Sequence, residues 1–159
     1  MMKSKITFLE AKKKLEAICA YQEKCQFDIE VKLTGWMFEE EQKNQLIAHL
    51  ITHNFINEER YAEAFVNDKY KIKKWGKQKI ISHLKQKRIS SYSSNKALKN
   101  IDLKLYYNNL LNISQKKWSE LKTKKEDIWI LKNKLMNHLA SKGYENDLIF
   151  DIVAETIKS

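Results

Sequence analysis

Proline is absent from this 159-residue chain, and glycine occurs only three times. These two residues supply the fixed or positive φ angles of many tight turns, and sheet proteins need many such turns. The plentiful residues include lysine, leucine, glutamate, glutamine and alanine, all of which favour helix. The composition therefore predicts an all-α protein.

Cysteine and long apolar runs are also scarce. The two cysteines, Cys19 and Cys25, cannot form a disulfide framework, and their spacing is not that of zinc ligands. No apolar run approaches the roughly 20 residues that a membrane-spanning helix needs, and the first residues contain no signal-peptide hydrophobic segment. We therefore expect a cytoplasmic protein that makes no membrane contact.

Positive charge is abundant and unevenly placed. The net charge is +10, and residues 68–104 hold twelve basic and two acidic side chains, whereas the remainder holds eighteen of each sign. A concentrated excess of this kind is typical of a surface that binds a polyanion. The alternative is a lysine-rich chain with solvated faces, but an even composition would have spread the excess.

An apolar pattern occurs three times along the chain. Each copy has hydrophobic residues at relative positions 0, 4, 9, 17 and 18, and successive copies are 51 and 55 residues apart. The three sets are Ile29, Leu33, Phe38, Leu46 and Ile47; Ile80, Leu84, Ile89, Ala97 and Leu98; and Leu135, Leu139, Tyr144, Ile152 and Val153. A spacing of four places two residues on one helical face, so each copy predicts a helix, a tight turn and a second helix.

A further helix precedes each copy. We expect these helices at about 8–21, 58–74 and 103–122, with Tyr61, Phe65 and Ile72 on the apolar face of the second one. The predicted caps are Asn57, Ser90 and Asp102 at helix starts and Gly143 after a helix end.

Together these helices predict three tandem three-helix repeats, at about 8–53, 54–101 and 102–158. One repeat buries too little surface to be stable alone, so the repeats should stack. We expect a single chain in which they form an elongated, curved array.

The segment from Asn54 to Ser90, NFINEERYAEAFVNDKYKIKKWGKQKIISHLKQKRIS, resembles the central repeat of the RecX family. Shared features are an acidic pair before an Arg-aromatic-Ala step, a basic stretch, a Gly, an Ile, and a Leu before a Lys-rich turn. Residues 141–153 resemble the third repeat, and QEKCQFDIEVKL resembles the first more weakly. Arg88 stands where many members have Gly, and Glu58 where many have Asp.

This resemblance implies a monomeric, non-enzymatic cytoplasmic protein that works without a cofactor in DNA repair, recombination and the SOS response. It implies binding to RecA nucleoprotein filaments and to single- or double-stranded DNA. It also implies modulation, usually inhibition, of the recombinase and co-protease activities of RecA. The residues themselves also suit a stand-alone basic helical module that binds nucleic acid.

The candidate contacts with the filament or DNA lie in the basic centre. They are Lys69, Lys71, Lys73, Lys74, Trp75, Lys77, Lys79, Lys85, Lys87 and Arg88. Lysines on a rigid exposed face can contact phosphates, and Trp75 could either stack on a base or pack between two helices. A second lysine group after residue 115 is either a solvated surface or a further contact region.

No catalytic or metal site is expected. His49 and His53 have the i, i+4 spacing of a two-histidine metal face, but no Glu follows His49 and the sequence offers no third ligand. The three glycines are not clustered, so they cannot build a phosphate-binding loop. Glu58 and Glu59 are explained by the positive end of the helix that they begin.

Overall fold

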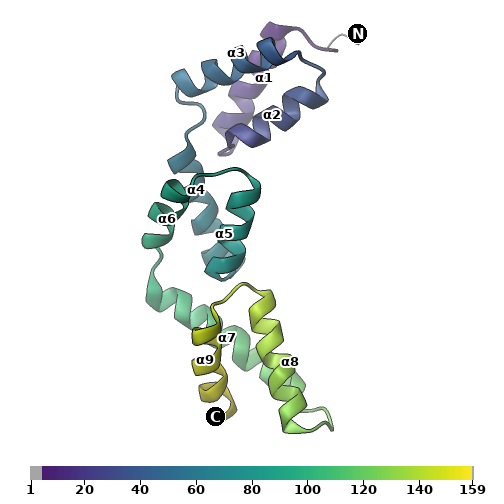
Figure 1. Cartoon of the computed structure of the whole chain (residues 1–159), viewed down its shortest axis with the longest axis vertical. Coiled ribbons are helices and arrows are strands. Elements are labelled where there is room, and N and C mark those ends of the chain that lie inside the picture. The colour runs from purple at the N-terminus through teal and green to yellow at the C-terminus, as the bar shows by residue number, and fades with distance from the viewer. Residues whose placement is uncertain (1–4, 159) are drawn as a thin grey trace. The chain divides into compact units, whose positions relative to one another are not determined.

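The computed structural model describes residues 5–158, and every regular element in that range is helical. The helices are α1 (Phe8–Tyr21), α2 (Gln26–Gly35), α3 (Glu40–Thr52), α4 (Glu58–Asn67), α5 (Lys77–Gln86), α6 (Ser91–Lys99), α7 (Leu103–Leu121), α8 (Ile128–Ser141) and α9 (Asn146–Lys158). A short π-helix, η1 (Asp68–Ile72), follows α4 directly. Figure 1 labels the α-helices in chain order. The all-α prediction is confirmed, and the order of helices repeats three times. The signal-peptide prediction falls partly on residues 1–4, which lie outside the described residues.

The repeated apolar pattern forms the interior of the repeats. Fourteen of its fifteen residues are buried, and Leu98 is half-buried. In the first repeat these residues join Ala11, Leu15 and Cys19 of α1 in one hydrophobic cluster. The spacing therefore predicted the core correctly, because positions 0 and 4 share one helical face and the late pair lies on the next helix.

The predicted caps are also present. The side-chain oxygen of Asn57 accepts from the N–H of Arg60 at 2.9 Å, and that of Ser90 accepts from the N–H of Ser93 at 3.2 Å. Asp102 accepts from the first turn of α7. These bonds satisfy backbone donors that the first turn of a helix leaves without a partner.

The turn inside each repeat places one residue in the left-handed region. Met37, Arg88 and Gly143 occupy the same position in the three copies, with φ of 66°, 60° and 95°. In the second copy the N–H groups of Arg88 and Ile89 donate to the carbonyls of Lys85 and Leu84, the two bonds of a Schellman motif. Glycine adopts this conformation without cost, so Met37 and Arg88 hold it at some expense in stability.

The helix predicted at 58–74 is not a continuous α-helix. Its α-helical part ends at Asn67, and η1 continues with i to i+5 bonding. A π-helical turn contains an extra residue, so it rotates the face that meets the core. Tyr70 is consequently buried, whereas Ile72 is 70% exposed, and the prediction that Ile72 faces the core is wrong.

The chain divides into two compact units. One comprises the described part of Met1–Ala64 together with Leu84–Lys96, and the other comprises Phe65–His83 with Ala97–Ser159 as far as it is described. In the first unit, α1 and α2 pack on α3. In the second, α7, α8 and α9 pack on one another, and α7 also packs on η1. The boundary between the units passes through the predicted second repeat.

Candidate nucleic-acid interface

Trp75 forms the centre of an aromatic and cationic cluster in the second unit. Its half-buried ring lies 4.6 Å from that of His83 and meets Phe65 edge-on at 6.5 Å. The ammonium groups of Lys69 and Lys79 lie 4.9 and 4.3 Å from the ring centroid. The half-buried Trp75 therefore packs against side chains from both of the segments that it joins.

Lys69 and Lys79 are not free surface cations. Lys69 pairs with Asp68 at 3.4 Å, and its side chain is only 21% exposed. Lys79 is half-buried beside Trp75. In both residues the ammonium group lies over the ring of Trp75.

Lys71, Lys73 and Lys74 fit the role of open phosphate contacts better. All three are exposed, and in the part of the chain that the structure describes none lies within ion-pair distance of a carboxylate. Lys74 has a φ of 57°, and its carbonyl accepts a hydrogen bond from the hydroxyl of Tyr144 at 2.8 Å. The backbone at Lys74 is thus held by a residue of the third repeat.

Lys85, Lys87 and Arg88 belong to the first unit, and two of them already have acidic partners. Lys87 pairs with Asp28 at 2.6 Å, and Arg88 lies 3.7 Å from Glu30. Burial would raise the pKa of Asp28, but the hydrogen bond and the charge of Lys87 outweigh it, so the pKa is lowered. Of these three cations, Lys87 and Arg88 are therefore paired, whereas in the described part of the chain no carboxylate lies within ion-pair distance of Lys85.

Close backbone contact joins the second and third repeats inside the second unit. The N–H of Gly76 donates to the carbonyl of Lys142 at 2.8 Å, and the N–H of Gln78 donates to that of Gly143 at 2.9 Å. A Cβ on Gly76 would lie 2.2 Å from the Gly143 carbonyl carbon. The central glycine of the RecX-like pattern is therefore required because two backbones touch there.

Buried tyrosines reinforce this joint. The hydroxyl of Tyr106 on α7 accepts from the N–H of Lys77 at 2.8 Å and donates to the carboxylate of Glu145. Burial raises the pKa of Tyr106, and the carboxylate of Glu145 raises it further. The hydroxyl therefore stays protonated; it accepts from the start of α5 and donates to Glu145, the residue before α9.

A depression of about 340 Å³ opens beside this joint. Its lining combines cations from the η1–α5 connection, from α7 and from the end of α8: Lys73, Lys74, Lys116, Lys117 and Lys142, with Ile113, Glu120 and His138. Burial lowers the pKa of His138, and the charges of Lys117 and Lys142 lower it further. The sequence suggested Lys116 and Lys117 only as part of a general lysine group, and Lys142 gave no signal, because their convergence depends on the packing of the repeats.

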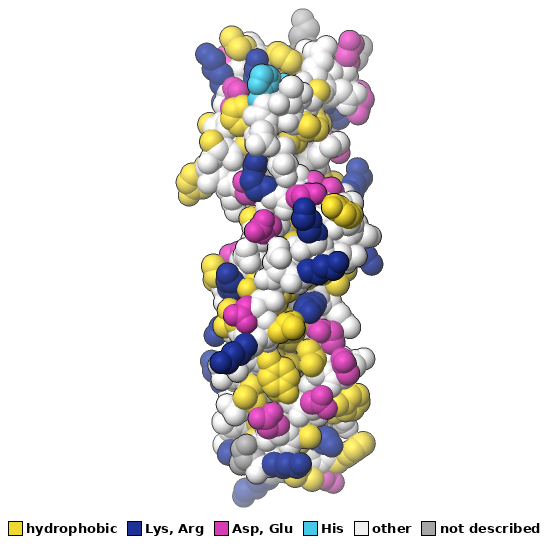
Figure 2. All heavy atoms as spheres, turned by 90° about the vertical axis from the view of Figure 1, so that its left-hand side faces the viewer, with side chains coloured by type: hydrophobic (Ala, Val, Ile, Leu, Met, Phe, Trp, Pro, Cys, Tyr) yellow, Lys and Arg dark blue, Asp and Glu magenta, His cyan; other side chains and the backbone are white. Residues whose placement is uncertain are grey.

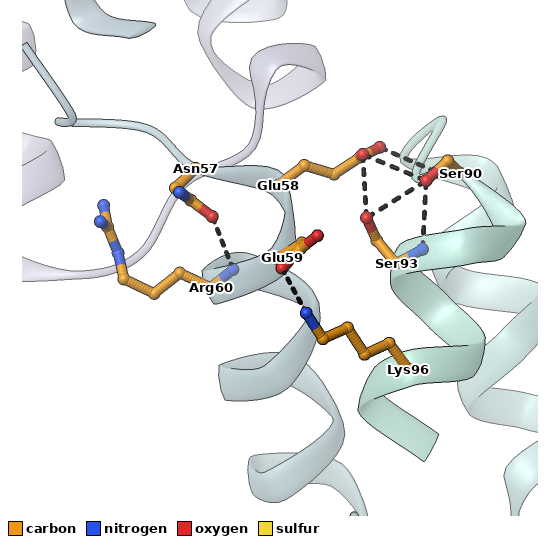
Figure 3. A network of polar contacts seen from close by, with 7 residues as sticks. All are labelled: Asn57, Glu58, Glu59, Arg60, Ser90, Ser93 and Lys96. Carbon is orange, nitrogen blue, oxygen red and sulfur yellow. Dashed lines mark hydrogen bonds and ion pairs between the residues drawn. The ribbon is translucent and has the colours of Figure 1, made fainter. Parts of the chain in front are cut away.

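The acidic pair at the start of α4 binds another helix. The carboxylate of Glu58 accepts from the N–H of Ser90 at 2.8 Å and from the hydroxyls of Ser90 and Ser93, whereas Glu59 pairs with Lys96 at 2.9 Å (Figure 3). Helix-dipole capping alone does not account for the pair, because Glu58 bonds to the start of α6 and Glu59 pairs with Lys96 further along it. All of them lie in the first unit.

Arg60, the other polar residue of the family-like motif, has a structural role. Its Nε donates to Glu23 at 2.6 Å, and its guanidinium also donates to the carbonyls of Asn54 and Phe55. One Arg therefore links the connection between α1 and α2 to the segment after α3. The motif gave no hint of this link because Glu23 lies 37 residues earlier in the sequence.

The histidine pair makes contacts of its own. The rings of His49 and His53 are 4.5 Å apart, and Nε2 of His49 lies 3.2 Å from a carboxylate oxygen of Glu16. Within residues 5–158, no three His, Cys, Asp or Glu side chains gather closely enough to hold a metal ion. None of the described helices is long and apolar enough to span a bilayer.

Cationic side chains do not dominate every face. The face in Figure 2 intersperses dark-blue Lys and Arg side chains with magenta acidic ones, and yellow hydrophobic side chains gather in its lower half. On that face opposite charges therefore lie close together and partly offset one another.

These features define a class: an all-helical protein of tandem three-helix repeats, with cations gathered where two repeats join. Comparison with known proteins identifies the group within that class. Residues 57–98 match the second three-helix domain of RecX, and residues 105–153 match the third. The chain belongs to the RecX family.

Named relatives agree with this assignment. The regulatory protein RecX of Clostridium botulinum (strain Eklund 17B / Type B) is 35% identical over 120 residues, which make up 76% of this chain and 56% of the relative. That of Clostridium perfringens (strain 13 / Type A) is 32% identical over 130 residues, covering 82% of this chain and 60% of the relative. The chain thus spans a little over half the length of these relatives.

Solved structures share the fold. The crystal structure of RecX from Lactobacillus salivarius superposes with a TM-score of 0.80 at 22% sequence identity, and the match covers 96% of this chain and 97% of that one. A second RecX crystal structure gives a TM-score of 0.81 at 20% identity over 93% of this chain and 71% of that one. The repeat fold is therefore common to proteins whose sequences have diverged widely.

Proposed function

We propose that this protein is a non-enzymatic regulator that binds RecA nucleoprotein filaments and lowers their recombinase and co-protease activity. The observation that carries the proposal is the match of two successive three-helix domains to the RecX family. The regulatory names of the relatives support the same role. The protein acts in the cytoplasm as a monomer, without a cofactor.

The proposed contact surface is the basic centre, with Lys71, Lys73 and Lys74 as its most accessible cations. Exposed ammonium groups without an acidic partner can neutralise phosphates and release counterions, which makes binding sensitive to salt. The paired residues Lys87 and Arg88 would have to leave Asp28 and Glu30 to do the same. We therefore assign the larger share of the phosphate contacts to the first three.

The test is a titration of the protein into RecA-coated single-stranded DNA, read by ATPase rate and filament length. A regulator of the filament should act well below one copy per RecA. A plain nucleic-acid-binding module, the second candidate function, should act only near saturation, by covering DNA. If the RecA ATPase rate falls only when the added protein is close to saturating the DNA, the proposal is contradicted.

The contact surface is tested by changing Lys71, Lys73 and Lys74 together to Gln. Each lost phosphate contact should reduce the slope of log affinity against log salt by about 0.7 to 0.9. The control changes three consecutive lysines of α1, residues 12–14, to Gln and removes the same charge. Equal weakening by both triple variants would mean that the charge acts only in bulk and that the assigned surface is wrong.

A further inference from the structure

The lysine-lined depression in the second unit has the composition of an anion site. Five lysines line it, and the lining contains a single carboxylate, that of Glu120. Glu120 lies 3.9 Å from Lys117, so it can offset at most one of the five. The C-terminal end of α8 adds only about half a negative charge. The positive excess therefore remains large.

The rim of the depression is held in place by bonds between repeats. The carbonyl of Lys74 accepts from the hydroxyl of the buried Tyr144, and the carbonyl of Lys142 accepts from the N–H of Gly76. Lys116 and Lys117 extend from α7, which packs on α8. Cations from three segments are thus brought together before any ligand arrives, and this lowers the cost of ordering a bound anion.

The size of the depression limits the ligand. A volume of about 340 Å³ lies at the lower end of the range for small-molecule sites. It can take a few phosphate groups in succession, but a double helix cannot enter it. Lysines scattered over a surface and paired with carboxylates attract an anion only weakly at any one place. The lysines of this depression instead line one concave surface, so their charges act on the same ligand.

We propose that this depression binds two or three consecutive phosphate groups, held by Lys73, Lys74, Lys116 and Lys142. It extends the proposed contact surface into the third repeat, and in that sense the inference rests on the proposed function. The phosphates can come from a nucleic-acid backbone or from a free oligophosphate such as a nucleotide tail. The chemistry of recognition is the same for both sources.

The test uses the purified protein without RecA, so that it can fail separately from the proposed function. Tripolyphosphate is titrated by calorimetry into the unchanged protein and into the double variant Lys116→Gln, Lys142→Gln. Removal of two of the cations should weaken binding about tenfold or more at low salt. The control, Lys122→Gln with Lys125→Gln, removes the same charge from exposed positions outside the depression and should weaken it less than about twofold.

A second readout does not depend on variants. His138 lines the depression beside Lys117, Lys142 and Glu120, and a bound polyanion should raise its pKa, which NMR of the imidazole follows. His49, in the other unit, serves as the internal control. The same titration with single-stranded oligothymidylate separates the two sources of phosphate. If both ligands raise the pKa of His138, the site is assigned to backbone phosphates. If tripolyphosphate alone raises it, the site is assigned to a free oligophosphate.

Either of those results supports the proposal. Equal weakening of tripolyphosphate binding by the two double variants would overturn it. An unchanged pKa of His138 at saturating tripolyphosphate would overturn it as well.

Discussion

Gly76→Ala should be among the most damaging single-methyl additions in this chain. The added Cβ would lie 2.2 Å from the carbonyl carbon of Gly143 and 2.2 Å from the backbone nitrogen of Tyr144. Non-bonded carbon atoms prefer about 3.5 to 4.0 Å, so the two backbones must separate by more than 1 Å. A flexible side chain could move aside, but a backbone in a packed joint cannot do so cheaply.

The expected loss of stability follows from the two hydrogen bonds that this separation would break. The bonds from Gly76 to Lys142, at 2.8 Å, and from Gln78 to Gly143, at 2.9 Å, would both exceed hydrogen-bond length. Two lost bonds cost about 1 kcal/mol each, and overpacking adds about 1 to 3 kcal/mol. The free energy of unfolding should therefore fall by about 3 to 5 kcal/mol, which lowers Tm by about 10 °C.

The assay is thermal and urea unfolding followed by circular dichroism, with Gly35→Ala as the matched control. Gly35 is the last residue of α2, and a Cβ there would meet no atom within 4 Å. Alanine is the better helix former, so the control should be neutral or stabilising by up to about 1 kcal/mol. A Gly76→Ala variant within about 1 kcal/mol of the unchanged protein would refute the close-contact argument.

Three further predictions concern stability. Met37→Gly should stabilise the protein by about 1 kcal/mol and so raise the urea midpoint, because residue 37 has a φ of 66°, which strains any residue but glycine. A lower midpoint would contradict this backbone strain. Glu58→Ala should lower stability by about 1 to 2 kcal/mol because its three hydrogen bonds to Ser90 and Ser93 are lost. Glu59→Ala removes only an exposed ion pair and should change the urea midpoint far less. Equal losses would count against a stabilising role for the Glu58 hydrogen bonds. Lys87→Met should destabilise at pH 7. The pKa of Asp28 is lowered in the folded state, so the contribution of the pair is fully present above the unfolded pKa of Asp28 and is lost as pH falls through its folded pKa. The difference between the variant and the unchanged protein should therefore shrink as the solution is acidified through that range; a loss independent of pH would contradict the pairing.

Repeated sequence patterns proved to be the reliable guide to the fold. The three apolar sets predicted the buried positions because α-helical geometry translates spacing directly into facing. The same reasoning failed at Ile72, because the π-helix η1 adds a residue to the turn and brings Tyr70 to the core in its place. No feature of residues 58–74 distinguishes this π-helical turn from a continued α-helix.

The candidate site was less predictable than the fold. The charge of residues 68–104 located the basic centre, since composition alone reports where cations are concentrated. It did not report that Lys87 pairs with Asp28, or that Lys142 joins Lys73 and Lys74 around one depression. Those relations connect residues 59 or more positions apart, and they arise only when neighbouring repeats pack.

The repeat of the sequence is not the unit of packing in this protein. Each compact unit contains one joint between repeats, and both units take part of the middle repeat. The bonds from Arg60 to Glu23 and from Lys87 to Asp28 cross the predicted boundary near residue 53. A fragment cut at that boundary would therefore leave two carboxylates without their partners. Duplication of one repeat would add a new joint as well as three helices, so each added copy has to match its neighbour's surface before it can contribute stability.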